Sequence, residues 1–157
     1  MQAFGEPVQL FEKDVRSMSL SENAKADAES SYILLNELNA GSTGRLRFYR
    51  PGPTAAFAPR DTMMPRYNEA TEAMLNLGFT PVARRTGGFL AVYDAQSLII
   101  DLVAAHESPR RDVIERFELF SHAIARALSR FSIDARVGQI DGEYCPGDYS
   151  VNAGGSI

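Results

Sequence analysis

The sequence has a single cysteine, Cys145, among its 157 residues. One thiol cannot form an internal disulfide, so the fold must be stable without oxidation and this cysteine needs an explanation of its own. Long hydrophobic runs are also missing, since none approaches the roughly 20 apolar residues that a membrane helix needs. The first residues lack the basic segment and apolar stretch of a secretory leader. We therefore expect a cytoplasmic protein with no membrane association.

Histidine and lysine are scarce as well. The two histidines, His106 and His122, are accompanied by no second cysteine and no cluster of carboxylates, so we predict no bound zinc or other metal. The two lysines, Lys13 and Lys25, both lie in the first part of the chain. Residues 45–85 therefore owe their positive charge entirely to arginine.

The net charge of −4 hides an uneven distribution. Residues 45–85 carry seven basic and three acidic side chains, whereas residues 1–40 carry three and seven. Arginine can hold a carboxylate or phosphate through two parallel hydrogen bonds, so this basic segment is either a site for a small anion or an ordinary solvated surface. The isoelectric point near 5.2 argues against nucleic-acid binding. The arginines are Arg45, Arg47, Arg50, Arg60, Arg66, Arg84 and Arg85.

Hydrophobic periodicity predicts helices interleaved with strands. Helices are expected from near Ser19 to about residue 40, at 65–77 and at 108–131, and strands at 46–50, 54–57, 79–83, 89–93 and 98–103. The three later strands should be neighbours at the centre of the sheet because they are so apolar. Residues 137–157 should form a loop followed by a short strand. The last helix should bury Val113, Phe117, Phe120, Ile124, Ala127 and Phe131.

This element order predicts an α+β fold, with a mixed, largely antiparallel sheet flanked by helices. Strands that follow one another too closely for helical crossovers favour antiparallel pairing. The length of 157 residues fits one domain, and 45% hydrophobic with 23% charged residues is ordinary for a globular protein. We therefore expect residues 1–157 to form a single domain.

Two short motifs could carry chemistry. The first, Arg84, Arg85, Thr86, Gly87 and Gly88, lies between two predicted strands, where paired glycines let backbone N–H groups approach a ligand and the side chains offer donors to an anion. A plain turn or bulge is the alternative. The second surrounds Cys145 with glycine and proline in residues 142–149, which places the thiol in a loop with access to substrate. The alternative there is a small buried hydrophobic residue.

Taken together, the motifs resemble the lipoate–protein ligase and octanoyltransferase family. The matching stretches are RRTGGFLAVYDAQSLIIDLV (84–103) and EYCPGDYSVN (143–152), supported more loosely by LRFYRPGPTAAFAP (46–59). The Tyr-Cys-Pro-Gly signal is most similar to the cysteine-dependent octanoyl-[GcvH]:protein N-octanoyltransferases. The resemblance implies a catalytic domain like those of biotin and lipoate ligases and class II aminoacyl-tRNA synthetases.

The resemblance also implies roles for residues. Cys145 would carry the acyl group as a thioester, and Arg84, Arg85, Thr86, Gly87 and Gly88 would form the substrate pocket. The family's catalytic lysine lies in a Lys-x-x-Gly motif after the cysteine, and neither lysine of this sequence stands there. We therefore expect the chain to be truncated at its C-terminus or to need a second chain that supplies this part.

Three functions are compatible with these features. The first is an acyltransferase that moves an octanoyl or lipoyl group to a lipoyl-domain lysine and needs no cofactor. The second is an ATP-dependent lipoate or biotin protein ligase, which would need ATP and magnesium. Its activity would not depend on the Cys145 thiol. The third is a non-catalytic fragment or subunit. The implied partners are lipoyl-domain proteins, namely the glycine cleavage H protein and the E2 subunits of 2-oxoacid dehydrogenases.

Overall fold

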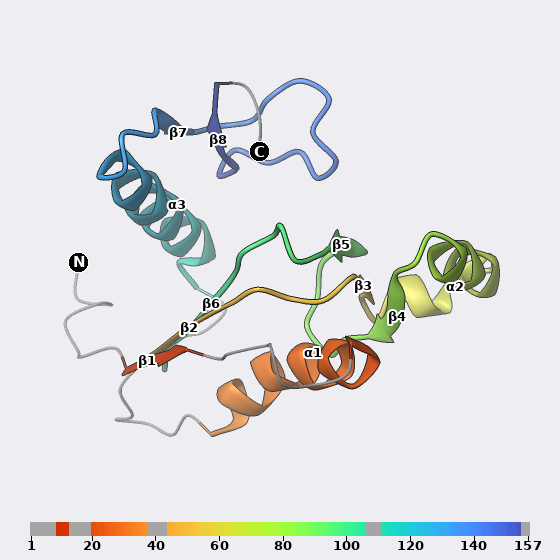
Figure 1. Ribbon diagram of the computed structural model, residues 1–157. Coiled ribbons are helices and arrows are strands. Elements are labelled where there is room, and N and C mark those ends of the chain that lie inside the picture. The colour runs from red at the N-terminus through yellow and green to blue at the C-terminus, as the bar shows by residue number, and fades with distance from the viewer. Residues whose placement is uncertain (1–8, 13–19, 38–43, 106–110, 155–157) are drawn as a thin grey trace. The chain divides into compact units, whose positions relative to one another are not determined.

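The computed structural model describes residues 9–12, 20–37, 44–105 and 111–154. They fall into two compact units, Met1–Glu107 and Ser108–Ile157 (Figure 1). The first unit contains two helices, a short 3₁₀ helix and six strands within its described residues, and the second contains one helix and two strands. Each unit is described by itself below.

The first unit is built on two small sheets, each with three described strands. One has the order β1 (Gln9–Glu12), β2 (Arg45–Tyr49) and β6 (Ile99–Val103), and the other has the order β4 (Thr80–Ala83), β3 (Thr54–Phe57) and β5 (Ala91–Tyr93). In each sheet the central strand pairs in parallel with one neighbour and antiparallel with the other. The helices are α1 (Leu20–Asn36), α2 (Tyr67–Asn76) and the 3₁₀ helix η2 (Asp61–Met63).

The expected positions of α1, α2 and strands β2 to β6 agree with the structure, whereas β1 and η2 were not expected. The expected strand neighbours were wrong. β4 and β5 flank β3 and do not pair with each other, while β6 belongs to the other sheet. Strands β2 and β3, which only the short segment 50–53 separates, also lie in different sheets. Hydrophobicity indicated that these segments are strands. It does not indicate which strand pairs with which, because an apolar strand can pair with any other, and so the pattern could not identify the central strand.

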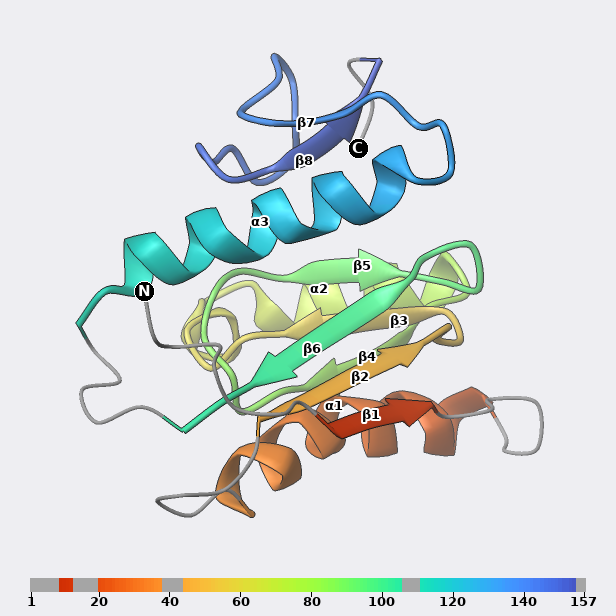
Figure 2. The same cartoon turned by 90° about the vertical axis from the view of Figure 1, so that its left-hand side faces the viewer.

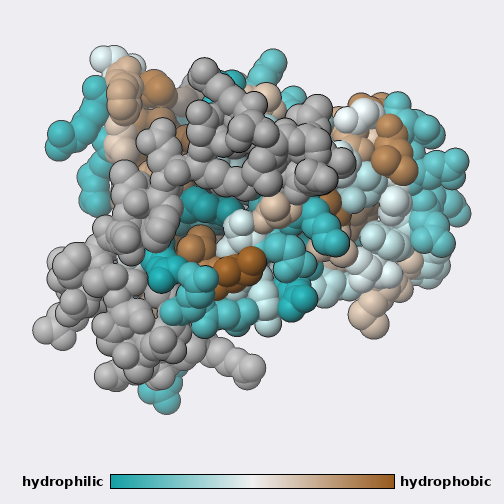
Figure 3. Space-filling view, turned by 60° about the horizontal axis from the view of Figure 1, so that its bottom comes forward, coloured by the Kyte–Doolittle hydropathy of each residue, from teal (hydrophilic) through white to brown (hydrophobic). Residues whose placement is uncertain are grey.

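Strand β3 lies at the centre of its sheet and carries small side chains. All four of its residues are buried, and two of them are alanines, Ala55 and Ala56. Ala24 and Ala28 of α1 pack against Ala56 and against Val82 of β4. The helix therefore approaches the sheet through small side chains on both sides. On the face shown in Figure 3, apolar side chains form small patches among hydrophilic ones.

The second unit consists of α3 (Val113–Ser129) packed against an antiparallel pair, β7 (Ala135–Val137) and β8 (Val151–Ala153) (Figure 2). The short strand expected near the end of the sequence is β8, whereas β7 was not expected. Ser121 and Ala125 are the buried positions of α3. The prediction of a buried face that includes Phe117 and Phe131 was wrong, since these side chains are 57% and 78% exposed.

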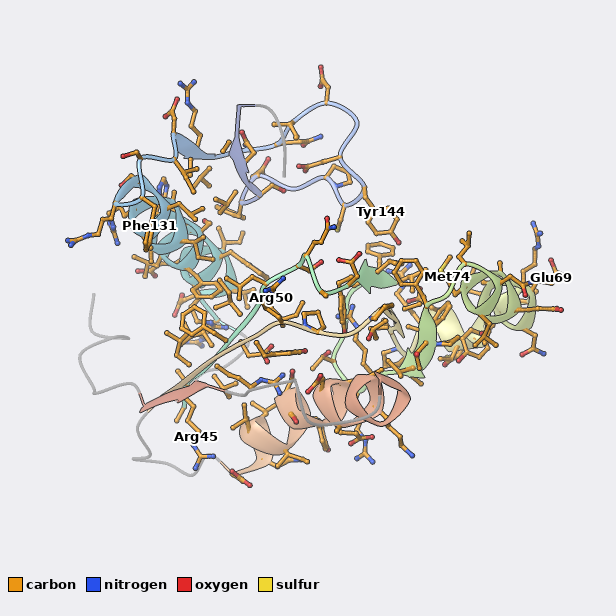
Figure 4. All side chains as sticks on the ribbon, in the orientation of Figure 1. Arg45, Arg50, Glu69, Met74, Phe131 and Tyr144 are labelled. Atoms are coloured by element: carbon orange, nitrogen blue, oxygen red, sulfur yellow. The ribbon has the colours of Figure 1, made fainter. Side chains whose placement is uncertain are left out.

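For Phe131 the physical reason is the end of the helix, whereas Phe117 lies within α3 and its ring stacks on that of Tyr149. α3 stops at Ser129 and Ser132 adopts a positive φ of 62°, so Phe131 leaves the helical face that it would otherwise share (Figure 4). The fold class is nevertheless confirmed. Among the described residues three of the five strand pairs are antiparallel, and helices pack on the sheets, as in a mixed α+β fold.

Candidate functional site

The predicted glycine turn, residues 84–88, connects β4 to β5 in the first unit. The Arg84 backbone N–H donates to the Phe57 carbonyl at 2.9 Å, which extends the pairing of β4 with β3. The Arg84 side chain then curls around the turn, and its Nη2 donates to the Phe89 carbonyl at 2.6 Å. Gly88 has φ +102°, and a Cβ there would meet Arg84 Nη2 at 3.0 Å. A glycine is thus required at position 88 both by the backbone and by the packed guanidinium.

The next residue, Arg85, points the other way, toward helix α1. Its guanidinium lies 4.8 Å from the centre of the Tyr32 ring, and its Nε is 3.7 Å from Glu29 Oε2. Hydrogen bonds with Asn36 and with Arg85, together with the positive charge of Arg85, lower the pKa of the Tyr32 hydroxyl. Thr86 is half-buried and Gly87 is exposed between these anchors. The turn is therefore held by its own Arg84 and by a contact with α1.

Each of the seven arginines of the basic segment has a partner inside the first unit. Helix α1 supplies Ser31 to Arg47 and Glu29 with Tyr32 to Arg85, so this helix contributes to holding two of the seven. Arg45 contacts Glu37, Arg47 contacts Asp101 and Ser31, Arg50 donates to the Ala95 carbonyl, Arg60 lies over the Phe89 ring, Arg66 contacts Glu69, Arg84 donates to the Phe89 carbonyl, and Arg85 contacts Glu29 and Tyr32.

The most buried of these arginines joins three elements. Arg47 of β2 donates from Nε to Asp101 Oδ2 at 2.7 Å, and its Nη2 donates to the Ser31 hydroxyl of α1 at 3.0 Å. The Ser31 hydroxyl donates in turn to Asp101 Oδ2 at 3.1 Å. The guanidinium also lies 4.3 Å from the centre of the Tyr49 ring. This network fixes α1, β2 and β6 together.

Two tyrosines lie beside this network, Tyr49 buried and Tyr93 half-buried. Burial raises the pKa of Tyr49 far above its ordinary value, and the Tyr93 hydroxyl adds to the rise. Burial also raises the pKa of Tyr93, against an opposing influence of Arg84. Both hydroxyls are therefore neutral at physiological pH and serve the interior as hydrogen-bonding groups.

The predicted nucleophile, Cys145, lies in the second unit within the segment that connects β7 to β8, residues 138–150, which we call the cysteine loop. Its thiol is exposed, as the sequence predicted, so the buried alternative is wrong. Tyr144 beside it is also exposed (Figure 4). The loop is anchored to α3 by stacking of the Phe117 and Tyr149 rings, whose centres are 6.2 Å apart, and to β8 by Asn152, whose Nδ2 donates to the Gly138 carbonyl at 3.0 Å.

Glu143 holds the cysteine loop together, and the sequence analysis missed it. Its Oε1 accepts from the Gly147 N–H at 2.7 Å and from the Ser150 hydroxyl at 3.0 Å. The sequence did contain a signal, because an acidic residue two positions before the cysteine in a glycine-rich segment can accept loop N–H groups. Asp101 was missed in the same way, although a carboxylate within an apolar strand indicates a buried partner.

The predicted site residues belong to different units. Residues 84–88 lie together in the first unit and Cys145 in the second, so the expected proximity of the thiol to the glycine turn stays a prediction. His122 is exposed on α3, and His106 lies outside the described residues. Within the described ranges no group of three or more histidine, cysteine or acidic side chains could hold a metal ion. None of the described helices is long and apolar enough to cross a membrane.

The fold is that of lipoate protein ligases. Protein Ta0514 of T. acidophilum, assigned as a lipoate protein ligase and solved with bound lipoic acid, matches with a TM-score of 0.67 and 19% identity over 95% of this chain and 58% of its own. Lipoate-protein ligase A bound with ATP matches with a TM-score of 0.63 and 22% identity over 95% of this chain and 57% of its own.

The sequence comparison indicates a more particular relationship. The octanoyl-[GcvH]:protein N-octanoyltransferase of Geobacillus kaustophilus is 28% identical over 134 residues, and that of Bacillus velezensis is 25% identical over 134 residues. Both alignments cover 82% of this chain and 47% of the relative, so the chain spans about half the length of the curated relatives that it matches. No family model matches the sequence. The chain is a distant homologue of the octanoyl-[GcvH]:protein N-octanoyltransferases and is structurally similar to lipoate protein ligases.

Proposed function

We propose that this chain carries part of the catalytic machinery of an acyltransferase, which moves an octanoyl or lipoyl group to a lipoyl-domain lysine through a thioester on Cys145. The observation that carries the proposal is the exposed thiol of Cys145 in a loop that hydrogen bonds hold in shape. The distant homology to octanoyltransferases supports it. A thiol serves this chemistry well because thiolate is strongly nucleophilic and a thioester is readily attacked by an amine.

The reaction consists of two exchanges at the acyl carbonyl. In the first, the Cys145 thiolate attacks the acyl amide of an octanoylated H protein, the C–S bond forms, the C–N bond breaks, and the leaving lysine amine takes up a proton. In the second, the amine of an acceptor lysine attacks the thioester, the C–N bond forms, the C–S bond breaks, and the amine releases a proton. No electron transfer is involved, so neither oxidant nor reductant is needed.

In this proposal the 84–88 turn lines the acyl pocket and a cation promotes the thiolate. The family resemblance assigns that cation to a lysine in a Lys-x-x-Gly motif. Neither lysine of this sequence follows Cys145. We therefore propose that a polypeptide segment outside residues 1–157 supplies the lysine, either on the same chain or on a second one. A bi-partite lipoate protein ligase from Thermoplasma acidophilum, which has a similar fold, gives a precedent.

An ATP-dependent ligase is the second candidate, because lipoate-protein ligase A, which was solved with ATP, has the same fold. A ligase of this kind would bind ATP and magnesium and hold an acyl-adenylate. The distant homology to octanoyltransferases favours the transferase. A cytoplasmic location follows from either function.

The deciding experiment compares the chain with its Cys145→Ser variant, each alone and with added polypeptide bearing the lysine motif. Octanoylated H protein is the donor, and intact mass spectrometry detects the acyl adduct. Because the sequence has one cysteine, an adduct that neutral hydroxylamine removes belongs to Cys145. We expect the adduct on the unsubstituted chain and none on the variant. If the variant instead modifies a lipoyl domain with lipoate, ATP and magnesium, the protein is a ligase. If neither the unsubstituted chain nor the variant transfers an acyl group, with or without the added polypeptide, the chain is a non-catalytic subunit.

A further inference from the structure

We propose that Glu143 is a positioning residue for Cys145, which closes the turn at residues 144–146 and so fixes the direction of the thiol. This inference rests on the proposed role of Cys145 as the acyl acceptor. Glu143 precedes the cysteine by two residues, and Gly147, whose N–H it accepts, follows by two. A single carboxylate thus spans the nucleophile from one side of the turn to the other.

The contacts of Glu143 reach three separate parts of the cysteine loop. Oε1 accepts from the Gly147 N–H at 2.7 Å and from the Ser150 hydroxyl at 3.0 Å, so it joins the residues after the cysteine to the start of β8. Oε2 lies 3.5 Å from the Ile140 N–H, at the long limit for a hydrogen bond, and the Glu143 N–H faces the Ile140 carbonyl at 3.4 Å. The carboxylate therefore ties the entry of the loop, its tip and its exit.

The loop needs such a tie because burial does not hold its tip. Tyr144, Cys145 and Pro146 are all exposed, so burial contributes little to the conformation of the tip. Gly142 immediately before Glu143 has φ +80°, a turn that favours glycine and that directs the following residue back over the loop. Backbone hydrogen bonds lie at the base of the loop and beside its tip, where the Gly138 N–H donates to the Ser150 carbonyl at 2.9 Å and the Ser150 N–H donates to the Gly147 carbonyl at 3.2 Å.

The charge of Glu143 strengthens these bonds. A hydrogen bond from a backbone N–H to an ionised carboxylate is shorter and stronger than one to a neutral acceptor, and the 2.7 Å contact with Gly147 fits that description. For a nucleophile the benefit is geometric, because displacement of a reacting atom by about 1 Å can cost on the order of a hundredfold in rate. Glu143 should therefore affect the rate of the first acyl exchange more than the binding of the donor.

Three variants separate positioning from other roles. Glu143→Ala removes the tie, Glu143→Gln keeps an acceptor oxygen at the same reach without the charge, and Asp141→Ala removes an exposed acidic side chain of the same loop as a matched control. Single-turnover acylation of Cys145 by octanoylated H protein is measured with the lysine-bearing polypeptide present. Hydrogen exchange of the Gly147 amide reports whether the loop stays ordered.

We expect Glu143→Ala to lower the maximal acylation rate at least tenfold, while the half-saturating donor concentration changes less than about threefold, in keeping with the geometric effect. Glu143→Gln should recover most of the rate and the slow exchange of Gly147, and Asp141→Ala should match the unsubstituted chain. The inference is overturned if Glu143→Ala acylates at full rate, or if Glu143→Gln loses as much as alanine does. If the unsubstituted chain forms no hydroxylamine-sensitive adduct, the proposed function itself has failed, which is a different result from an adduct that is indifferent to Glu143.

Discussion

Replacing Asp101 by alanine would leave the buried Arg47 guanidinium without its carboxylate. The Arg47 side chain is 5% exposed and that of Asp101 is 20% exposed, so most of the pair is out of water. Removing one partner of a buried pair costs about 3–5 kcal/mol, because the remaining charge stays desolvated. Ser31 still accepts from Arg47 at 3.0 Å, and Asp101 is partly solvated, so we expect a loss near the lower end, about 3 kcal/mol.

Urea unfolding followed by far-ultraviolet circular dichroism measures this loss. Tyrosine fluorescence is the second probe, since the sequence has no tryptophan. Because the chain has two compact units, the transition is assigned by hydrogen exchange in peptides from β2 and β6 of the first unit. The melting temperature should fall as well, by about 2–4 °C for each kcal/mol in a chain of this size.

The control removes both charges together, as Arg47→Met with Asp101→Leu. Buried ion pairs replaced by apolar residues of similar volume are often neutral in stability, so this double variant should be more stable than Asp101→Ala alone. The reasoning is refuted if Asp101→Ala costs less than about 1 kcal/mol, the size of a surface ion pair. It is also refuted if the double variant loses the full sum of its two single substitutions.

Two further predictions concern the same unit. Gly88→Ala should destabilise the protein by about 1–2 kcal/mol in urea unfolding, because an L-residue is strained at φ +102° and its Cβ would press on Arg84. The control is Gly87→Ala, which has no atom within 4 Å of the added Cβ and should change stability by less than about 0.5 kcal/mol. Equal losses in the two variants would contradict the geometry. Burial raises the pKa of Tyr49 and of Tyr93, so their stabilising effect is complete below the ordinary tyrosine value of about 10 and is lost as pH rises above it. An absorbance titration should show Tyr49 and Tyr93 ionising at higher pH than the exposed tyrosines, and Tyr49→Phe should remove one of these late-ionising groups.

The sequence predicted where the elements lie because periodicity is local. The apolar spacing of residues 65–77 and 108–131 indicated α2 and α3 within a few positions of their observed bounds. Strand order could not be obtained in this way, since β3 pairs with β4 and β5 across long stretches of chain and its four residues offer no pattern that distinguishes a centre from an edge.

The candidate site shows the same division. The exposed position of Cys145 followed from the glycines and proline around it, which are properties of the neighbouring sequence. The role of Arg84 did not follow, because its guanidinium closes on the Phe89 carbonyl of its own turn, and that geometry depends on a backbone angle at Gly88. Likewise, Arg47 and Asp101 are far apart in the sequence and meet only through the pairing of β2 with β6.

The alanines between α1 and the sheet couple the interior of the protein to the glycine turn. Ala24 and Ala56 share one buried cluster with Val82, and Ala28 packs against it, so short side chains fill much of the contact between α1 and the sheet. Helix α1 also carries Glu29 and Tyr32, which hold Arg85. A larger residue at Ala56 would push α1 away from the sheet and weaken the contact of Glu29 and Tyr32 with Arg85 of the turn. If the 84–88 turn lines the acyl pocket as proposed, small side chains in the interior of the first unit would help to set its position.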